Sequence, residues 1–308
     1  MARSIPILVG PTASGKTALA LRLAERVPSL EVVSADSRQV YRMLTIGTAK
    51  PTHAERKAVP HHLIDFLDPA ERYSAGRFRT DAEGAIADCL RRGTFPVVVG
   101  GTGLYLRALT EGLSPIPAVP DEVNRRLHHA LEAEGLPALY RRLQDRDPVA
   151  AFGIRPNDTQ RILRALAVCE ATGKPLSVWW KSPALPSGYR YAWLGIRSPQ
   201  ERLRDRIRRR AYAMLDAGLE NEVRRLLERG YGWDTPAMRT VGYREWRSHF
   251  EGGTSVEEIA SRIITDTAQY GKRQMTWFRA LEHIHWVDGV GEDLAEVALE
   301  WLESVRRS

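Results

Sequence analysis

Residues 10–17 read Gly-Pro-Thr-Ala-Ser-Gly-Lys-Thr and follow directly on the apolar run 5–9, Ile-Pro-Ile-Leu-Val. This is the pattern G-x-x-x-x-G-K-[ST], in which every fixed position has a mechanical role. The glycines let the backbone curl, so that successive N–H groups point at phosphate oxygens. Lys16 adds a cation and Thr17 offers a hydroxyl to Mg²⁺. The stretch therefore predicts a strand, a phosphate-binding loop, and a helix whose positive dipole end faces the same anion.

The first hundred residues alternate short apolar strands with helical stretches. Strands are expected at 5–9, 31–34 and 96–99, and helices at 16–26 and 75–92. Near-continuous apolar strands separated by helices are typical of a parallel sheet that is covered on both faces. The pattern therefore predicts an α/β fold whose core is a P-loop NTPase-like parallel sheet.

The pattern changes at 113–120, where three prolines in six residues mark a linker. Helices are expected after it at 121–134, 137–144 and 157–171. A second stretch rich in Pro, Ser and Gly covers 182–188 and precedes a strand at 191–196. We therefore predict a mostly helical insertion over 113–187.

The insertion divides a core made of residues 1–112 and 188–308. This core is expected to finish in helices at 199–217, 218–229 and 255–280. The chain shows no run of 18 apolar residues, so neither a membrane span nor a signal peptide is expected.

Composition limits the classes of partner. Cys89 and Cys169 are the only cysteines, which excludes disulfide scaffolds and zinc modules and fits a reducing cytoplasm. The formal net charge is +7, which favours a polyanionic partner, although many soluble proteins are mildly basic.

Polar residues follow two of the expected strands. Asp36 comes directly after the second strand, at the sheet edge where ligands bind in open parallel sheets; a helix N-cap is the alternative interpretation. The third strand ends in Gly100-Gly101-Thr102. Many P-loop NTPases have an Asp there to organise Mg²⁺. Two glycines and a hydroxyl instead leave room for a substrate, which argues against an ordinary ATPase.

Two further stretches are rich in basic residues. On a helix, Arg202, Arg206 and Arg210 would share one face and form a cationic ridge suited to phosphate, whereas a solvated face is the simpler interpretation for Arg204, Arg208 and Arg209. Residues 269–279 mix basic and aromatic side chains, which fits either a nucleic-acid surface or core packing of Trp277 and Phe278.

Nine motifs together strongly resemble those of tRNA dimethylallyltransferases, the isopentenyl-tRNA transferases. They stand at 10–17 (GPTASGKT), 36–41 (DSRQVY), 46–51 (IGTAKP), 60–65 (PHHLID), 73–75 (YSA), 100–105 (GGTGLY), 157–161 (NDTQR), 241–243 (VGY) and 272–277 (KRQMTW). The resemblance runs from about residue 5 to 286 in the family's order, without the C-terminal zinc finger of eukaryotic relatives. It implies the bacterial type of enzyme, which transfers the dimethylallyl group of dimethylallyl diphosphate to N6 of adenosine 37 in tRNAs that read codons beginning with U. The products would be N6-(dimethylallyl)adenosine and diphosphate.

The resemblance also implies roles for individual residues. Asp36 matches the catalytic carboxylate that accepts the N6 proton, and Thr102 matches a residue at the adenosine end of the channel. Arg210 matches an arginine that reaches the diphosphate, with Arg206 as a weaker candidate. The diphosphate is expected on Gly10, Pro11, Thr12, Ala13, Ser14, Gly15, Lys16 and Thr17, with Mg²⁺ on Thr17.

The same resemblance implies contacts with the tRNA anticodon stem-loop. The expected residues are Asp36, Ser37, Arg38, Gln39, Thr102, Asn124, Gln160, Arg161, Ile162, Leu163 and Arg164. Position 124 departs from the family, which often has Arg there, and Arg125 follows it. Because N6 is reached only outside the base stack, we expect a flipped adenosine beside Asp36 and Thr102. We expect a monomer with no membrane partner.

Three alternatives share parts of this pattern. A P-loop kinase would share the loop, the sheet and an arginine-bearing helix, but not the 36–41 motif. An adenylate prenyltransferase would use free AMP, ADP or ATP as acceptor, and the helical insertion and basic charge favour tRNA over these. An RNA-binding protein with a vestigial loop fits least, because every loop position is intact.

Overall fold

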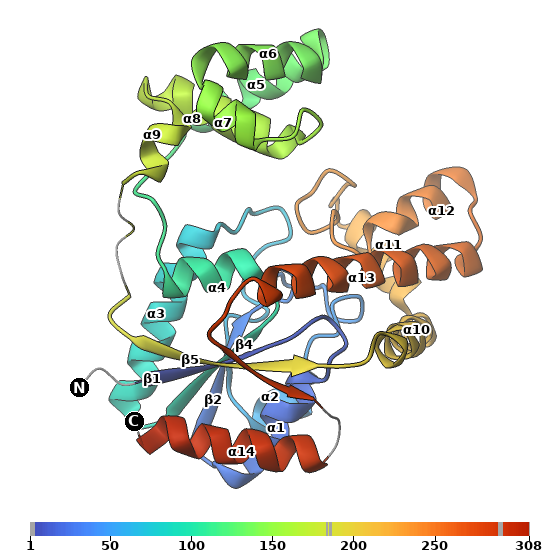
Figure 1. Cartoon of the computed structure of the whole chain (residues 1–308). Helices are drawn as coiled ribbons and strands as arrows, with labels where there is room; N and C mark the ends of the chain where they lie inside the picture. Colours follow the sequence, from blue (N-terminus) through green and yellow to red (C-terminus); the bar gives the residue numbers. More distant parts are fainter. Residues whose placement is uncertain (1–3, 183, 185–186, 289–291, 308) are drawn as a thin grey trace. The chain divides into compact units, whose positions relative to one another are not determined.

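The structure, a computed structural model, describes residues 4–182, 184, 187–288 and 292–307. Within them, parallel strands form one sheet in the order β3-β2-β4-β1-β5-β6 (Figure 1). Their bounds are Ser4–Val9 (β1), Leu30–Ala35 (β2), His61–His62 (β3), Phe95–Gly100 (β4), Arg190–Arg197 (β5) and Ile284–Asp288 (β6). The predicted α/β class with a parallel sheet is therefore confirmed.

Helices cover both faces of the sheet because successive strand residues point to opposite sides. Leu8 packs on one side with α1 (Lys16–Arg26) and α14 (Glu292–Arg307). Ile7 and Val9 pack on the other side with α3 (Ala75–Arg92), α4 (Gly103–Thr110) and the end of α13 (Val256–Arg279). Each face thus has its own apolar core.

Local signals set the helix ends. Ser74 caps α3 by accepting a hydrogen bond from the Arg77 amide, and Gly93 ends it with a left-handed φ of 75°. Ser255 and Glu258 form a reciprocal capping box at the start of α13. These two helices begin and end within one residue of the predicted bounds.

The expectation that helix 255–280 completes the chain was wrong, because β6 and α14 follow it. Strand β6 lies at the edge of the sheet and buries only Ile284 and Val287 fully, so it lacks the continuous apolar run that marks the central strands. The short elements α2 (His53–Ala58) and β3 also had no periodic signal.

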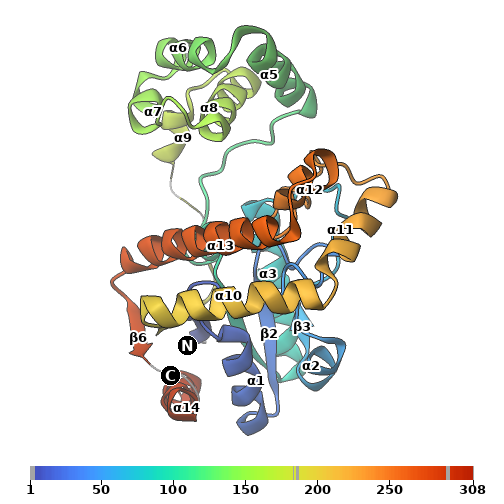
Figure 2. The ribbon, with the colours of Figure 1, turned by 90° about the vertical axis from the view of Figure 1, so that its right-hand side faces the viewer.

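A second layer of helices packs beside the carboxyl ends of the strands. It contains α10 (Gln200–Asp216), α11 (Leu219–Glu228), a 3₁₀ turn η1 (Arg244–Trp246) and α12 (Arg247–Gly252). Helix α10 runs alongside α13 (Figure 2). These helices and the segment after β2 share an apolar cluster that includes Leu44, Tyr243 and Trp246.

The chain divides into two compact units, one of residues 1–110 and 187–308 and one of residues 111–186. The second unit consists of α5 (Asp121–Glu134), α6 (Leu136–Arg146), α7 (Pro148–Gly153), α8 (Thr159–Thr172) and α9 (Leu176–Trp180). It has its own apolar core, in which Leu139, Leu143 and Leu166 are fully buried. No helix in the described part of the chain has the length and apolar character of a membrane span.

Candidate active site

The phosphate-binding loop joins β1 to α1 and leaves several groups available for a ligand. Gly15 has a left-handed φ of 96° directly before the helix, a conformation that favours glycine. A Cβ on Gly10 would lie 2.8 Å from Ser14 Oγ, so the tight turn needs glycine there too. Ser14 Oγ is buried and has no hydrogen-bond partner among the described residues. A buried hydroxyl without a partner is costly, which points to a ligand at this loop.

Lys16 is half-buried at the start of α1, and its ammonium group donates to the carbonyls of Gly10 at 2.9 Å and Pro11 at 2.8 Å. Burial lowers the pKa of Lys16 to about 8; the Asp36 carboxylate opposes this shift and the Arg210 guanidinium adds to it. The three charged groups therefore lie within electrostatic reach of one another, as parallel strands that end at one edge allow.

Asp36 follows β2 and uses one oxygen to shape the chain. Its Oδ1 accepts hydrogen bonds from the amides of Arg38 at 2.8 Å and Gln39 at 3.2 Å. Its Oδ2 has no hydrogen-bond partner in the described part of the chain. The capping interpretation and the functional one are thus compatible, because one oxygen holds the turn and the other is left to accept a proton.

Thr102 lies beside this turn, since its hydroxyl oxygen accepts a hydrogen bond from the Ser37 amide at 3.1 Å. Tyr270 of α13 lies close to Thr102; burial raises the pKa of Tyr270, and the Asp36 carboxylate adds to the rise. The structure therefore brings Asp36 and Thr102 together, with Tyr270 as a neighbour that the sequence motifs did not single out.

The glycines at the end of β4 have a different role from the one expected. A Cβ on Gly100 would lie 2.3 Å from the Ala35 carbonyl oxygen, and one on Gly101 would lie 2.2 Å from Gln274 Nε2. Both distances are impossible for real atoms. The interpretation that these glycines leave room for a substrate is therefore wrong: the protein's own atoms occupy that space.

Gln274 links the loop to the end of β4. Its Oε1 accepts from the Thr12 amide at 2.8 Å, and its Nε2 donates to the Gly101 carbonyl at 2.8 Å. The residue is buried, so both amide atoms are held in one orientation. Gln274 belongs to the 272–277 motif, whose sequence alone indicates no role for it.

The predicted arginine ridge of α10 is only partly at this site. Arg206 donates to the Ser14 carbonyl at 3.2 Å and Arg210 donates to the Thr48 carbonyl at 3.2 Å, whereas Arg202 is exposed. Burial lowers the pKa of Arg210, and the Asp36 carboxylate opposes the shift. Arg204, Arg208 and Arg209 are exposed, in agreement with the solvated-face interpretation.

Aromatic residues near the end of α13 pack rather than face solvent. Phe278 is fully buried in the core between sheet and helices, and the half-buried Trp277 packs against that core. A Cβ on Gly103 would lie 2.5 Å from the Trp277 ring. For these two residues, core packing is the correct alternative.

Comparison with known proteins identifies the family of this chain. A family model described as "IPP transferase" matches residues 39–281, and one described as "Isopentenyl transferase" matches residues 3–66. The chain belongs to the IPP transferase family. The resemblance to tRNA dimethylallyltransferases found in the sequence is confirmed.

Curated relatives and solved structures agree with this assignment. The chain is 48% identical to tRNA dimethylallyltransferase 1 of Syntrophotalea carbinolica, covering 94% of the chain and 92% of the relative. It is 46% identical to the tRNA dimethylallyltransferase of a Roseiflexus species, covering 97% and 100%. The tRNA isopentenylpyrophosphate transferase of Bacillus halodurans superposes with a TM-score of 0.72 at 33% identity, over 99% and 97% of the two chains. A eukaryotic dimethylallyltransferase acting on tRNA gives a TM-score of 0.80 at 29% identity, over 93% and 74%.

The residues that family resemblance places on tRNA in the helical unit differ in exposure. Gln160, Arg161 and Arg164 of α8 are exposed, and Leu163 is half-buried. Ile162 is fully buried in the core of that unit, so its side chain is not available to RNA. In α5, Asn124 is half-buried and the following residue, Arg125, is exposed.

Away from the loop, three side chains of the types that bind metal ions lie close together. Glu31, His62 and Cys89 hold one potential ligand atom each within 4.8 Å of one another. Arg92, however, already binds both Glu31 oxygens, at 2.6 and 2.7 Å. Burial raises the pKa of the Cys89 thiol to about 11, and its hydrogen bond to Glu31 adds to the rise, so the thiol stays protonated. We interpret the cluster as a structural ion network.

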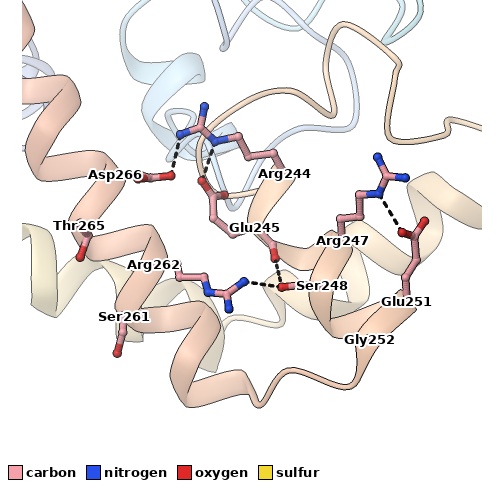
Figure 3. A pocket seen from close by; sticks show the side chains of 10 residues that line it. All are labelled: Arg244, Glu245, Arg247, Ser248, Glu251, Gly252, Ser261, Arg262, Thr265 and Asp266. Atoms are coloured by element: carbon pink, nitrogen blue, oxygen red, sulfur yellow. Dashed lines mark hydrogen bonds and ion pairs between the residues drawn. The ribbon is translucent and has the colours of Figure 1, made fainter.

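A cavity of about 870 Å³ lies between η1, α12 and the first half of α13, apart from the phosphate-binding loop (Figure 3). Two of its three arginines pair with carboxylates of the same wall. Arg244 binds Glu245 at 3.0 Å and Asp266 at 2.6 Å, and Arg247 binds Glu251 at 2.8 Å. The third arginine, Arg262, donates to the Ser248 hydroxyl at 2.7 Å. The lining thus has three basic and three acidic side chains, without the excess of cations found at the loop.

Proposed function

We propose that the chain transfers the dimethylallyl group of dimethylallyl diphosphate to N6 of adenosine 37 in tRNAs that read codons beginning with U. The main support for this proposal is that Lys16, Arg210 and Asp36 lie within electrostatic reach of one another at one edge of the sheet. Cations that can hold a leaving diphosphate thus lie beside a carboxylate oxygen that can take the proton of the attacking amine.

The chemistry requires both groups, because the lone pair of an exocyclic adenine amine is delocalised into the ring. In the proposed reaction, N6 bonds to C1 of the dimethylallyl group as the bond from C1 to the diphosphate oxygen breaks. The electron pair leaves with the diphosphate, where Lys16, Arg210 and the loop amides stabilise it. The N6 proton passes to Asp36, whose Oδ2 has no other partner in the described chain.

The loop residues fit Mg²⁺, a hard ion that prefers oxygen ligands. Thr17 is half-buried and its hydroxyl has no hydrogen-bond partner within the described ranges, so it is free to serve as one ligand. We propose that the remaining ligands are diphosphate oxygens and water. When bound, the ion would neutralise part of the charge of the leaving group.

We propose that the target adenosine flips out of the anticodon loop to meet Asp36 and Thr102. Residues 36–39 are half-buried around the Asp36 turn, which supports a role for Ser37, Arg38 and Gln39 in contacting the loop nucleotides. On the helical unit, the exposed side chains of Gln160, Arg161 and Arg164 are proposed to contact the anticodon stem.

The decisive experiment supplies radiolabelled dimethylallyl diphosphate together with unmodified tRNA, AMP or no acceptor. Label should enter tRNA alone and appear in N6-(dimethylallyl)adenosine at position 37. Label in AMP would instead identify an adenylate prenyltransferase. Tight binding of ATP without affinity for dimethylallyl diphosphate would identify a kinase-like protein.

The role of the helical unit has its own test. Replacing Arg161 and Arg164 with Ala should weaken tRNA binding and lower the slope of log Kd against log salt by about one per lost phosphate contact. Arg142→Ala in the same unit is the matched control, because Arg142 binds both Glu134 oxygens at 3.0 and 2.9 Å, more closely than Arg161 approaches Asp158 at 3.4 Å. An unchanged salt slope in the double variant would refute the contact.

A further inference from the structure

One carboxylate outside the catalytic motifs binds the turn that follows the DSRQVY motif. Glu222 of α11 accepts hydrogen bonds from three consecutive backbone amides, those of residues 45–47, at distances of 2.9 to 3.1 Å. Three converging N–H groups form an anion-binding concavity of the kind that otherwise holds phosphates or carboxylates. Here the protein supplies the anion itself.

The surroundings of this carboxylate fix it in place. Tyr243, fully buried, donates its hydroxyl to Glu222 Oε1 at 2.6 Å. Burial raises the pKa of Tyr243 well above its ordinary value, and the Glu222 carboxylate adds to the rise, so the hydroxyl keeps its proton. A Cβ on Gly47 would lie 2.5 Å from the Tyr243 ring, so turn and ring are in direct contact. The turn therefore has little freedom to move relative to Glu222.

Thr48, which completes the turn 45–48, contacts two side chains of the candidate active site. The Thr48 carbonyl accepts hydrogen bonds from Arg210 Nη2 at 3.2 Å and from Gln39 Nε2 at 3.2 Å. Among the described residues, it is the one hydrogen-bond acceptor of the Arg210 guanidinium. The direction of the Thr48 carbonyl thus sets where the Arg210 guanidinium lies.

We propose that Glu222 is a positioning residue for the transfer reaction, which orients Arg210 through the turn 45–48. The inference rests on the proposed function, in which Arg210 holds the diphosphate. Glu222 touches neither substrate, and it acts by holding three amides whose turn presents the Thr48 carbonyl. A neutral amide in its place would offer one acceptor oxygen to these donors instead of two charged ones.

The first test compares Glu222→Gln with Glu220→Gln. Glu220 lies on the same helix and pairs with Arg224 at 2.6 Å, so its variant removes the same charge without touching the turn. Glu222→Gln should lower kcat/KM for dimethylallyl diphosphate by about tenfold, the order seen when a group that orients a metal-binding side chain is lost. Glu220→Gln should stay within twofold of the unmodified protein. Equal effects of the two variants would overturn the inference.

A double-mutant cycle with Arg210→Ala separates positioning from a general structural effect. If Glu222 acts through Arg210, Glu222→Gln should change kcat/KM by less than twofold once Arg210 is absent. The same tenfold loss in both backgrounds would overturn the inference. An Arg210→Ala variant that itself retains full kcat/KM would instead refute the proposed role of Arg210, and with it the basis of the inference.

A milder variant keeps the test available if Glu222→Gln fails to fold, which thermal melting would show. Tyr243→Phe removes only the hydroxyl that donates to Glu222 and keeps the buried ring. In the protein that retains Arg210, Tyr243→Phe should lower kcat/KM by about threefold. In the Arg210→Ala variant, it should leave kcat/KM unchanged. Equal loss in both backgrounds would contradict the inference.

Discussion

Strand β2 has a carboxylate near each end, and the fold treats the two differently. Near the start, Glu31 is buried and binds Arg92 through both oxygens, with His62 at 2.6 Å as a further partner. Directly after the end, Asp36 binds only backbone amides, and its Oδ2 has no hydrogen-bond partner in the described chain. Both oxygens of the Glu31 carboxylate are thus occupied by charged partners, whereas one oxygen of the Asp36 carboxylate remains free to bind a ligand.

The cations show the same difference. Arg92 is neutralised by Glu31 and Asp88, and its hydrogen bonds hold the pKa of Glu31 well below its usual range. Lys16 and Arg210 instead donate to backbone carbonyls, which carry no net charge to cancel theirs. A cation that is held by neutral acceptors keeps its charge for a ligand. Structural ion networks and the proposed catalytic groups therefore differ in the groups that they bind. Three substitutions and one pH dependence test this difference.

The largest effect is expected from Asp36→Asn. The amide oxygen can still accept from the Arg38 and Gln39 amides, so the turn should persist, but the side chain can no longer take a proton. We expect a loss of kcat of roughly a thousandfold, with the Kd for tRNA within threefold of the unmodified protein. Single-turnover chemistry at the normal rate, with weakened tRNA binding, would contradict the role as base.

The second change is Lys16→Met, which removes the loop cation and keeps most of the side-chain volume. Affinity for dimethylallyl diphosphate should fall by on the order of a hundredfold, as measured by calorimetry. Because burial disfavours the charged form of Lys16, the melting temperature should stay the same or rise. A large drop in melting temperature would mean that Lys16 has a structural role like that of Arg92.

The pH dependence of diphosphate binding gives the third test. Lys16 is charged below its pKa of about 8 and neutral above it, so affinity should weaken as the pH rises through that value. Between pH 7 and pH 9 the Kd for dimethylallyl diphosphate should increase by about tenfold. Lys16→Met is the control, because its affinity should lack this dependence. A flat profile in the unmodified protein would argue against Lys16 as the titrating group.

The smallest effect on activity is expected from Glu31→Gln at the other end of the strand. Activity should stay within twofold, while the free energy of unfolding falls by about 2 kcal/mol at neutral pH because Arg92 loses its charged partner. The pKa of Glu31 is lowered in the fold, so its stabilisation is present above its ordinary value of 4.5 and is lost as the pH falls below it. The difference between variant and unmodified protein should therefore shrink in acid. A loss of activity without a loss of stability would contradict the structural role of Glu31.

Sequence reasoning recovered the elements that local signals specify. The loop 10–17 and the helices at 16–26, 75–92 and 121–134 follow from glycine positions, caps and apolar periodicity within the segment itself. It missed β6 and α14, since an edge strand with two fully buried residues has no distinctive local pattern. It also misread Gly100 and Gly101, because the atoms that fill their space come from Ala35 and Gln274.

The site residues also fall into those that the motifs identified and those whose partners are distant in the sequence. Motif resemblance placed Lys16, Asp36, Thr102 and Arg210 on one list, and the structure brings Lys16, Asp36 and Arg210 within electrostatic reach and Thr102 beside the Asp36 turn. Glu222 was not found, although it binds three amides, because its partners lie about 175 residues away in the chain. The role of Gln274 was missed for the same reason, because Gly101 lies 173 positions away in the chain.

By itself, the sequence of residues 10–17 predicted a phosphate-binding loop at the start of α1, since every fixed position acts through its own backbone or side chain. The surrounding motifs determined the family. Only the tertiary structure decided which charged groups remain available, because a cation is neutralised or preserved by acceptors that come from distant segments. The Thr48 carbonyl holds Arg210 and the Glu31 carboxylate holds Arg92. This difference in partner, rather than in residue type, separates the proposed catalytic edge of the sheet from the structural one.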